Sequence, residues 1–362
     1  MLYQKIIRPI LFLFDAEKVH SFTIKYLKIL NYSFFYNIVN RITRVDSLRL
    51  KQQIWGLDFK TPIGLAAGMD KHAAVPNAWP AFGFGWVQIG SITNLEQPGN
   101  PKPRLWRLPK DRGIVVYYGI PNPGAAAMVD KIKQQGKNKK TLWSVSIAKS
   151  TRAPMEGAAE DYGMAFEFLN GLGDIITINL SCPNVKDFTG LQKKEILEPI
   201  LNNIASLNKY NQPIWLKIGP DLNTAELDDI IYLAKKYKVA AIVACNLSKK
   251  RDHLNLKSKN RDKQGGVSGK SIALQSNKII SYLYKNGENK YKIVGVGGIF
   301  DATDAYDKIK AGADLLQIAT GFIYGGPMSI HAINKGLDKH LKQDNFGHIS
   351  KAVGIEADKY AL

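Results

Sequence analysis

Eight short apolar segments alternate with helical stretches along most of the chain, and this alternation constrains the fold more than any other feature. Each segment is a nearly continuous apolar run, which is typical of parallel strands buried on both faces. The segments cover residues 63–67, 86–90, 142–147, 174–179, 213–218, 239–245, 292–297 and 314–319. Helical patterns lie between most of them, at residues 124–135, 158–171, 193–209, 224–237, 271–285, 302–311 and 328–341.

Eight β/α units over about 300 residues predict an α/β fold, the TIM (β/α)8 barrel. A doubly wound sheet would need fewer strands and a glycine-rich turn after the first one, and no G-x-G-x-x-G follows it. We expect the barrel over residues 46–345, an N-terminal amphipathic helical extension over 1–45 and a C-terminal tail over 346–362.

Two stretches interrupt the alternation. Residues 91–120 are rich in proline and polar residues and predict an inserted hairpin. Residues 247–268 form a long basic connection after the sixth strand, and connections of this length are usually functional or disordered. Both stretches follow the C-terminal ends of strands, where barrel active sites lie.

The first 45 residues combine apolar residues at helical spacing with seven basic and two acidic side chains. Pro9 is expected to kink or restart the first helix, and Asp15 to cap a second one. The segment lacks the cleavage site of a secretory signal. Two interpretations stay open: a helical pair lying in the headgroup region of a membrane, or a pair packed on the protein's own core.

The formal net charge of +19 allows nucleic acid, anionic lipid, an anionic substrate or simply a lysine-rich surface. No nucleic-acid-binding module is recognisable, so we expect no nucleic-acid partner. Two cysteines exclude a disulfide scaffold, and no histidine forms a metal-ligand pair with a carboxylate motif. No apolar run reaches the roughly 20 residues of a spanning helix, so any membrane association is expected to be peripheral.

Polar residues and glycines follow the predicted strands at the end where barrel chemistry takes place. Two lysines there suit a planar, electron-accepting cofactor or an anionic substrate, although Lys217 could instead pair with a carboxylate inside the barrel. Glycines and a hydroxyl after strands seven and eight are typical of a phosphate site, although tight left-handed turns also need glycine. These residues are Ala67, Gly68, Lys71, Asn179, Lys217, Asn246, Gly297, Gly298, Thr320 and Gly321.

The two cysteines receive different interpretations. Cys182 lies between Ser181 and Pro183 and is a plausible base or nucleophile, because a thiol has a reference pKa of about 8.5 that its surroundings can lower. Cys245 ends an apolar strand and is expected to pack there or to offer a backbone contact to a cofactor.

Several segments resemble the dihydroorotate dehydrogenase family: GLAAGMDKHA, QPGNPKPRLWRLPKDR, INLSCPNVKDFTGLQ, LKIGPDL, QGGVSGK and GVGGIFDATDAYDKIKAGADLLQIATGFIYGGP. The resemblance runs from about residue 1 to 345, and AEKVHSFT near the N-terminus is similar to the membrane-associated, quinone-reducing class 2 branch. It implies an FMN-dependent dehydrogenase of pyrimidine biosynthesis that oxidises dihydroorotate to orotate, passes electrons to a membrane quinone and lies peripherally on the cytoplasmic face of a membrane.

The resemblance also implies roles for individual residues. It makes Cys182 the base that removes the substrate's C5 proton while C6 gives hydride to the flavin, and it places His20 and Arg107 along a quinone tunnel. The substrate contacts would be Lys71, Asn179, Asn184 and Asn246. The flavin contacts would be Ala67, Gly68, Lys71, Ser91, Ser146, Asn179, Lys217, Cys245, Gly269, Gly297, Gly298, Thr320 and Gly321.

The chain departs from the family's pattern around the substrate. Cys182 stands where the quinone branch has serine, as in a soluble branch, and Ser91 stands where the family has threonine. The other departures are Val116 for a substrate-binding asparagine, Leu247 for threonine, Ser146 for a flavin-contacting asparagine and Ala319 for tyrosine.

These departures leave two interpretations open. The protein is either a divergent dihydroorotate dehydrogenase or a paralogue with the same flavin and quinone chemistry that acts on a different small cyclic substrate. A hypothesis of another class is a non-catalytic basic barrel that binds anionic membrane.

Overall fold

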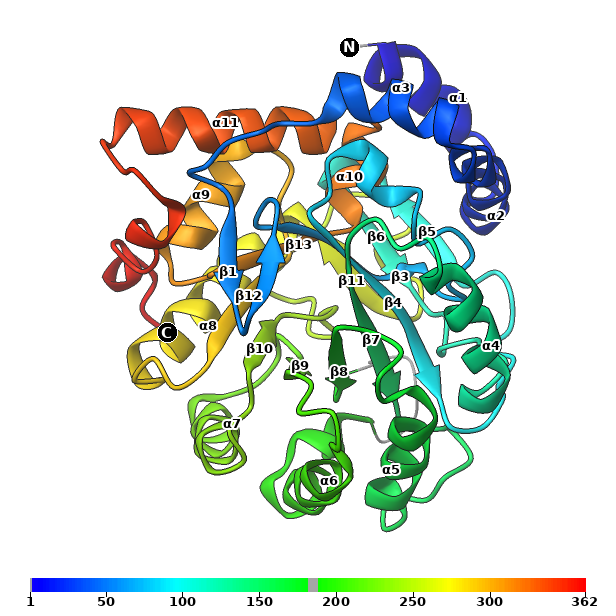
Figure 1. Ribbon diagram of the computed structural model, residues 1–362, viewed down its shortest axis with the longest axis vertical. Helices are drawn as coiled ribbons and strands as arrows, with labels where there is room; N and C mark the ends of the chain where they lie inside the picture. The colour runs from blue at the N-terminus through cyan, green and yellow to red at the C-terminus, as the bar shows by residue number, and fades with distance from the viewer. Residues whose placement is uncertain (1, 182–187) are drawn as a thin grey trace.

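This computed structural model describes residues 2–181 and 188–362, and its centre is a closed barrel of eight parallel strands (Figure 1). The predicted TIM barrel is therefore confirmed, and every predicted strand is present. The barrel strands are β3 (Ile63–Asp70), β4 (Trp86–Thr93), β7 (Leu142–Ala148), β8 (Ile175–Asn179), β9 (Ile214–Ile218), β10 (Ala241–Ala244), β12 (Lys292–Val296) and β13 (Leu315–Ile318).

The N-terminal end of the barrel is closed by a small hairpin, β1 (Gln52–Ile54) and β2 (Leu57–Phe59), which the sequence did not predict because both strands have only three residues. Phe59 packs with Trp86 and Trp215 in a fully buried aromatic cluster at this end. Because this end is filled by side chains, a ligand site can form only toward the other end of the barrel.

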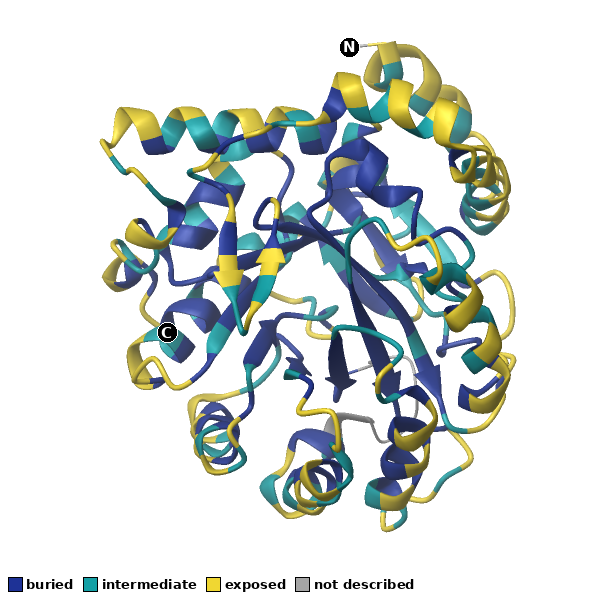
Figure 2. Ribbon diagram, in the orientation of Figure 1, coloured by how far each residue is buried: buried dark blue, intermediate teal, exposed yellow. Residues whose placement is uncertain are grey.

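Helices surround the barrel, and each predicted helical stretch corresponds to one of them. They are α4 (Ala125–Gly136), α5 (Ala158–Leu169), α6 (Lys194–Leu207), α7 (Thr224–Lys236), α8 (Ala273–Asn286), α9 (Ala302–Lys310) and α11 (Ser329–Gln343). Their inner faces are buried against the strands, and their outer faces are exposed (Figure 2). A further short helix, α10 (Thr320–Gly325), was not predicted, because six residues are too few to show a helical period.

The two interrupting stretches meet in one three-stranded antiparallel sheet. Residues 91–120 contain the hairpin of β5 (Leu105–Leu108) and β6 (Gly113–Val116), as predicted. The connection 247–268 ends in β11 (Gly266–Gly269), which pairs with β6 and buries Val267 against it. The inserted segments therefore form a rigid wall beside the mouth of the barrel.

The N-terminal segment contains three helices, one more than predicted. A π-helical turn, Tyr3–Ile7, leads into α1 (Arg8–Phe12) just before Pro9, in line with the expected restart. The side chain of Asp15 accepts a hydrogen bond from the Lys18 amide and caps α2 (Ala16–Leu27), as predicted. The unpredicted helix α3 (Ser33–Thr43) begins after Tyr32, whose extended backbone separates it from α2.

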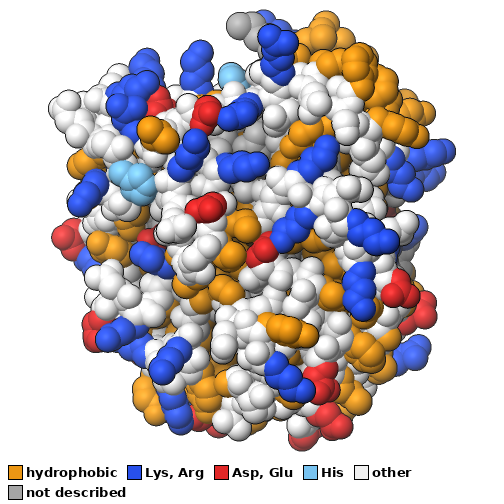
Figure 3. Space-filling view, viewed as in Figure 1, with side chains coloured by type: hydrophobic (Ala, Val, Ile, Leu, Met, Phe, Trp, Pro, Cys, Tyr) orange, Lys and Arg blue, Asp and Glu red, His pale blue; other side chains and the backbone are white. Residues whose placement is uncertain are grey.

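The N-terminal helices pack on the barrel with one face and expose the other. Leu30 is buried, and Ile24, Leu27 and Val39 pack against the same core. We call the opposite side the apolar outer face, and Figure 3 shows hydrophobic side chains gathered there, at the upper right of the view. The exposed apolar residues of this segment are Leu2, Ile6, Ile7, Ile10, Leu13, Phe14, Phe22, Tyr26, Ile29, Tyr32, Phe34, Phe35, Ile38 and Ile42. Among residues 2–181 and 188–362, no helix is long and apolar enough to cross a membrane.

Candidate active site

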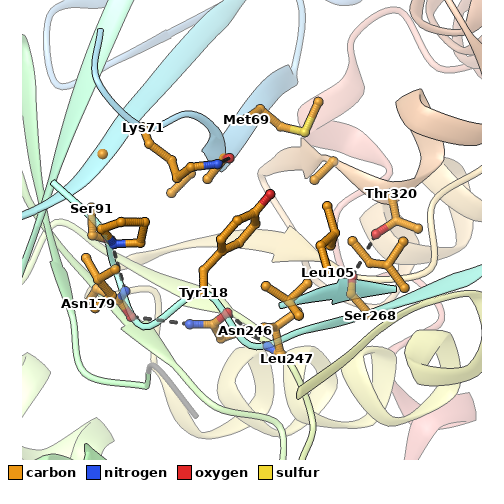
Figure 4. A pocket seen from close by; sticks show the side chains of 18 of the residues that line it. Met69, Lys71, Ser91, Leu105, Tyr118, Asn179, Asn246, Leu247, Ser268 and Thr320 are labelled. Atoms are coloured by element: carbon orange, nitrogen blue, oxygen red, sulfur yellow. Dashed lines mark hydrogen bonds between the residues drawn. The ribbon is translucent and has the colours of Figure 1, made fainter. Parts of the chain in front are cut away.

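A recess opens at the C-terminal end of the barrel strands, with a volume of about 950 Å³ including the part open to solvent. Ser91, Asn179 and Asn246 form one end of it, and Leu105 lies toward the other end, beside Ser268 and Thr320 (Figure 4). Within the described part of the chain, no acidic side chain lines it. The lining residues are His20, Ala67, Gly68, Met69, Lys71, Gly90, Ser91, Leu105, Ile114, Val116, Tyr118, Gly119, Ile120, Pro121, Asn179, Lys217, Asn246, Leu247, Ser268, Ala319, Thr320 and Ile323.

Irregularities in two strands turn their residues toward this recess. The pairing of β3 with β4 is interrupted between Leu65 and Asp70, and the pairing of β4 with β7 shifts between Gly90 and Ile92, which leaves Ser91 out of register. The buried carboxylate of Asp70 then accepts hydrogen bonds from the amides of Ala74 and Val75. This contact fixes the loop that begins with Lys71.

A chain of hydrogen bonds joins the predicted polar residues. The Asn246 amide donates to the Asn179 side-chain oxygen at 3.3 Å, and the Asn179 amide donates to the Ser91 hydroxyl at 3.0 Å. Ser146 lies behind Ser91, with 2.7 Å between the two hydroxyl oxygens. These contacts fix the orientation of both asparagine side chains before any ligand arrives.

Two lysines add positive charge to this end. Lys217 is 5% exposed and lies beside Asn179 in the register of β8 and β9. The ammonium of Lys71 lies 4.0 Å from the centroid of the Tyr118 ring. Burial lowers the pKa of Lys71 to about 8, and the Glu17 carboxylate partly opposes this shift. Lys71 therefore changes its charge within a pH range in which enzymes are commonly assayed.

The opposite end of the recess is apolar and reaches the N-terminal helix α2. Met69, Leu105, Ile114 and Ile323 line it. The His20 ring approaches the Met69 carbonyl oxygen with Nε2 at 2.9 Å, and burial lowers the pKa of His20 to about 4. A carbonyl can only accept, so the neutral ring donates from Nε2 and its Nδ1 is an acceptor.

Some predicted residues lie outside the lining of the recess. Cys182 and Asn184 fall outside the residues that the structure describes. The Arg107 guanidinium contacts the Phe14 carbonyl oxygen at 2.6 Å and the ring of Phe12 at 4.5 Å, at the turn between α1 and α2. The other predicted residues that lie behind or beyond the lining are Ser146, Cys245, Gly269, Gly297, Gly298 and Gly321.

Several lining residues were not singled out from the sequence. The most important is Tyr118, whose buried hydroxyl has no hydrogen-bond partner among the described residues. Ile114 is another: it alternates along β6 with Val116, which the sequence did single out, and both point to one side of the strand, a period-two signal that the sequence does contain. That this side faces the recess depends on how the inserted sheet folds over the barrel, which local sequence does not encode.

The sequence and the fold of this chain match those of one known protein family. A family model described as dihydroorotate dehydrogenase matches residues 49–341. The chain belongs to the dihydroorotate dehydrogenase family. The resemblance inferred from its motifs is therefore confirmed, and its relatives are named as quinone-dependent enzymes, the class 2 branch.

Relatives of the dihydroorotate dehydrogenase family match almost the whole chain. A protein of Crocosphaera subtropica named dihydroorotate dehydrogenase (quinone) is 42% identical to this chain. The match covers 88% of this chain and 86% of the relative. One of the same name from Christiangramia forsetii is 40% identical over 94% of this chain and all of its own. A solved structure of the Eimeria tenella enzyme in complex with ferulenol has a TM-score of 0.82 at 29% identity, covering 86% of this chain and 89% of that one.

Dihydroorotate dehydrogenases are flavin-dependent oxidoreductases, and the recess fits such a cofactor. Gly68 has a φ of +92° and lines the recess, and a Cβ atom built there would meet nothing within 4 Å, so the backbone is open to a flat ligand. The two lysines and the absence of a lining carboxylate among the described residues suit an electron-rich ring and a phosphate. At one edge, the hydroxyls of Ser268 and Thr320 lie 2.9 Å apart and are suitable donors to phosphate oxygens.

Proposed function

We propose that this protein oxidises dihydroorotate to orotate, with FMN as its cofactor and a quinone as its electron acceptor. The observation that carries this proposal is that one recess joins a cationic, amide-rich end to an apolar end beside α2. A polar, anionic ring suits the first end and a quinone suits the second, and both ends face the same central space. Family membership supports the same pair of half-reactions.

The polar end would bind and orient the substrate and the cofactor. The ammonium of Lys71 would attract the substrate's carboxylate. The hydrogen bond between Asn179 and Asn246 would orient both side chains toward the substrate's ring. Cys182 follows Ser181 directly, and we assign its thiolate the removal of the C5 proton. The chemistry that a bound FMN supplies is hydride acceptance from C6 and delivery of two electrons to the quinone.

The phosphate of FMN would lie beyond Thr320, where Ser268, Gly297 and Gly298 also gather. Gly297 and Gly298 have φ values of +111° and +76°, and a Cβ on Gly298 would meet Ala273 at 2.3 Å. These positions therefore require glycine for the backbone to turn as it does. Lys217 would contact the flavin ring from the barrel floor, where its charge stabilises electron density on the ring.

The apolar end would admit the quinone. Its walls offer hydrophobic contact, and His20, which lines the recess, keeps Nδ1 as an acceptor. We extend the proposal to the cell: the apolar outer face docks on the surface of a membrane at its cytoplasmic side, from which a membrane quinone enters past α2. The exposed apolar residues and the basic charge of this segment support this location.

A second candidate keeps the flavin and quinone chemistry but changes the substrate. Val116, Leu247 and Ala319 all line the recess, where the family's pattern has asparagine, threonine and tyrosine. Losing a hydrogen bond to a buried polar ring costs about 1–3 kcal/mol per unpaired group. A less polar or larger cyclic substrate avoids this cost. A non-catalytic barrel is disfavoured, because the chain belongs to a family of dehydrogenases and keeps Lys71, Asn179 and Lys217 in the recess.

A steady-state assay tests the proposed reaction. Purified full-length protein is mixed with dihydroorotate and a short-chain quinone, and quinone loss and orotate formation are followed together. We expect equal amounts of quinone consumed and orotate formed. Quinone reduction that does not depend on dihydroorotate, in protein with a full complement of flavin, would contradict the assignment and favour the second candidate.

A further inference from the structure

A second groove lies between α1 and the barrel, separate from the active-site recess. It measures about 1100 Å³ including the part open to solvent. Arg8 and Phe12 of α1 form one side, Arg112 of the β5–β6 turn forms another, and Phe300 and Tyr324 form the floor. Gln4, Pro9, Pro109 and Gly325 complete the lining, so that no acidic side chain among the described residues lines the groove.

The two arginines of this groove are held by aromatic rings and not by carboxylates. Arg8 donates to the Tyr324 carbonyl oxygen at 3.1 Å, and its guanidinium lies 5.8 Å from the centroid of the Tyr324 ring. The Arg112 guanidinium lies 4.3 Å from the centroid of the Phe300 ring. Neither forms a salt bridge within the described part of the chain. Stacking on a ring leaves the in-plane N–H groups of a guanidinium available, and their fork matches a phosphate.

The groove lies on the inner side of a helix whose other side is apolar and exposed. Ile6, Ile10 and Leu13 are 53%, 53% and 83% exposed, whereas Arg8 and Phe12 face the groove. A helix that lies in a membrane surface buries its apolar side to the depth of the upper acyl chains. Its opposite side then lies at the level of the lipid phosphates, and this is where the two guanidinium groups are.

We propose that this groove binds the phosphate of an anionic phospholipid headgroup, with Arg8 and Arg112 as its ligands. The inference rests on the membrane docking in the proposed function and adds a stereospecific site to it. A phospholipid fits better than a free phosphate because Pro9 and Phe12 give the groove apolar lining next to the exposed Ile10 of the same helix. Acyl chains contact such a rim, and an inorganic ion gains nothing from it.

Vesicle binding by the full-length, flavin-loaded protein tests the site. The groove variant carries Arg8→Gln and Arg112→Gln, and the control carries Lys18→Gln and Lys25→Gln, two exposed residues of α2 with the same total charge. Cosedimentation is measured with phosphatidylcholine vesicles that contain or lack phosphatidylglycerol. If only diffuse electrostatic attraction acts, the loss of two positive charges weakens binding to phosphatidylglycerol vesicles equally in both variants, on the order of tenfold. The groove predicts a further loss of about tenfold in the groove variant only.

Equal losses in the two variants would overturn the proposal. Arg112→Gln alone is the second variant, because it leaves the contact of Arg8 with Tyr324 intact and α1 docked; it should still bind more weakly than Lys18→Gln. A soluble arm compares dihexanoyl phosphatidylglycerol with inorganic phosphate. The lipid should raise the Tm of the wild type and not of the groove variant, and an equal rise with inorganic phosphate would contradict a lipid site.

The same preparations are assayed with a soluble quinone, which separates this inference from the proposed function. Because the groove lies outside the active-site recess, the groove variant should turn over a soluble quinone like the wild type. Absence of turnover in all proteins refutes the reaction, whereas normal turnover with equal vesicle binding refutes the headgroup site alone.

Discussion

At the scale of single residues, burial sets the charge of the groups that would meet the substrates. Desolvation lowers the pKa of both His20 and Lys71, and the charge of Lys71 lowers the pKa of His20 further. His20 is therefore neutral throughout the physiological range, whereas Lys71 titrates near pH 8. The recess therefore holds a neutral imidazole near a lysine that titrates.

The pKa of Lys71 predicts how orotate binding depends on pH. Below about pH 8 the ammonium is charged and attracts the carboxylate of orotate, and above it the free protein must first take up a proton. The Kd for orotate should therefore be constant from pH 6 to 7.5 and rise toward higher pH by up to about tenfold per unit. Flavin absorbance changes measure this Kd. The Lys71→Arg variant keeps its charge and should lack the rise; the same rise in both proteins would remove Lys71 from this role.

Cys182 carries the second prediction at this scale. Cys182→Ala should abolish reduction of the flavin by dihydroorotate while the flavin stays bound, because the thiolate acts on the substrate and not on the cofactor. Cys182→Ser should retain some reduction, with its pH dependence displaced upward because a hydroxyl is a weaker acid than a thiol. Rapid mixing measures both rates. An alanine variant as fast as the wild type would show that another group removes the proton.

The residues that the sequence could identify are those next to the ends of strands. Lys71, Asn179, Lys217 and Asn246 were predicted because a parallel barrel brings all strand ends to one side. Tyr118 was not, because it lies in the inserted segment and reaches the recess only when that segment folds back over the mouth. Tertiary position of this kind has no local signature.

At the scale of elements, the long periodic segments were predictable and the short ones were not. The barrel strands and the surrounding helices follow from apolar runs and helical spacing. The β1–β2 hairpin and α10 contain too few residues for a period, and α3 was missed although it shows a regular stripe. On α3 the stripe of Phe34, Ile38 and Ile42 is exposed, at 70%, 47% and 59%. A stripe at this spacing on a surface helix needs an apolar partner outside the chain.

The stripe predicts how α3 contributes to membrane docking. Replacing Phe34, Ile38 and Ile42 with serine should weaken binding to phosphatidylcholine vesicles by about a thousandfold, since burying each side chain in the membrane contributes roughly 1.5–3 kcal/mol. The Tm should hardly change, because none of the three is buried. Leu30→Ser is the matched control: it is 4% exposed, so it should lower the Tm instead. Unchanged vesicle binding of the triple variant would show that α3 does not face the membrane.

At the scale of the whole molecule, one ion pair ties the N-terminal extension to the barrel. The guanidinium of Arg104 is buried and contacts both carboxylate oxygens of Glu17 on α2, with the shortest distance at 2.9 Å. It also donates to the carbonyl oxygens of Pro98 and Asn100. The ring of Tyr118 contacts both this guanidinium and the ammonium of Lys71, at 5.4 Å and 4.0 Å from its centroid. Helix α2 is thereby connected to the Lys71 side of the active-site recess.

Removal of the Glu17 carboxylate should break the ion pair with Arg104 and destabilise the protein. Glu17→Gln should lower the free energy of unfolding by about 2–3 kcal/mol, below the usual range for a buried pair because Arg104 keeps its two carbonyl partners. Thermal and urea unfolding measure the change. Lys102→Gln is the control, because Lys102 contacts the same carboxylate at 3.9 Å but is 70% exposed, and it should change stability by less than about 1 kcal/mol. An equal change in the free energy of unfolding for the two substitutions would show that the Glu17–Arg104 ion pair does not stabilise the protein.

Anaerobic mixing of the oxidised, flavin-loaded protein with dihydroorotate tests the proposed reaction most directly, because it isolates the first half-reaction from the quinone and the membrane. We predict that the visible absorbance of the flavin bleaches at ordinary substrate concentrations and that one orotate forms for each flavin reduced. Unchanged absorbance, in protein whose flavin a chemical reductant still bleaches, would contradict dihydroorotate as the substrate.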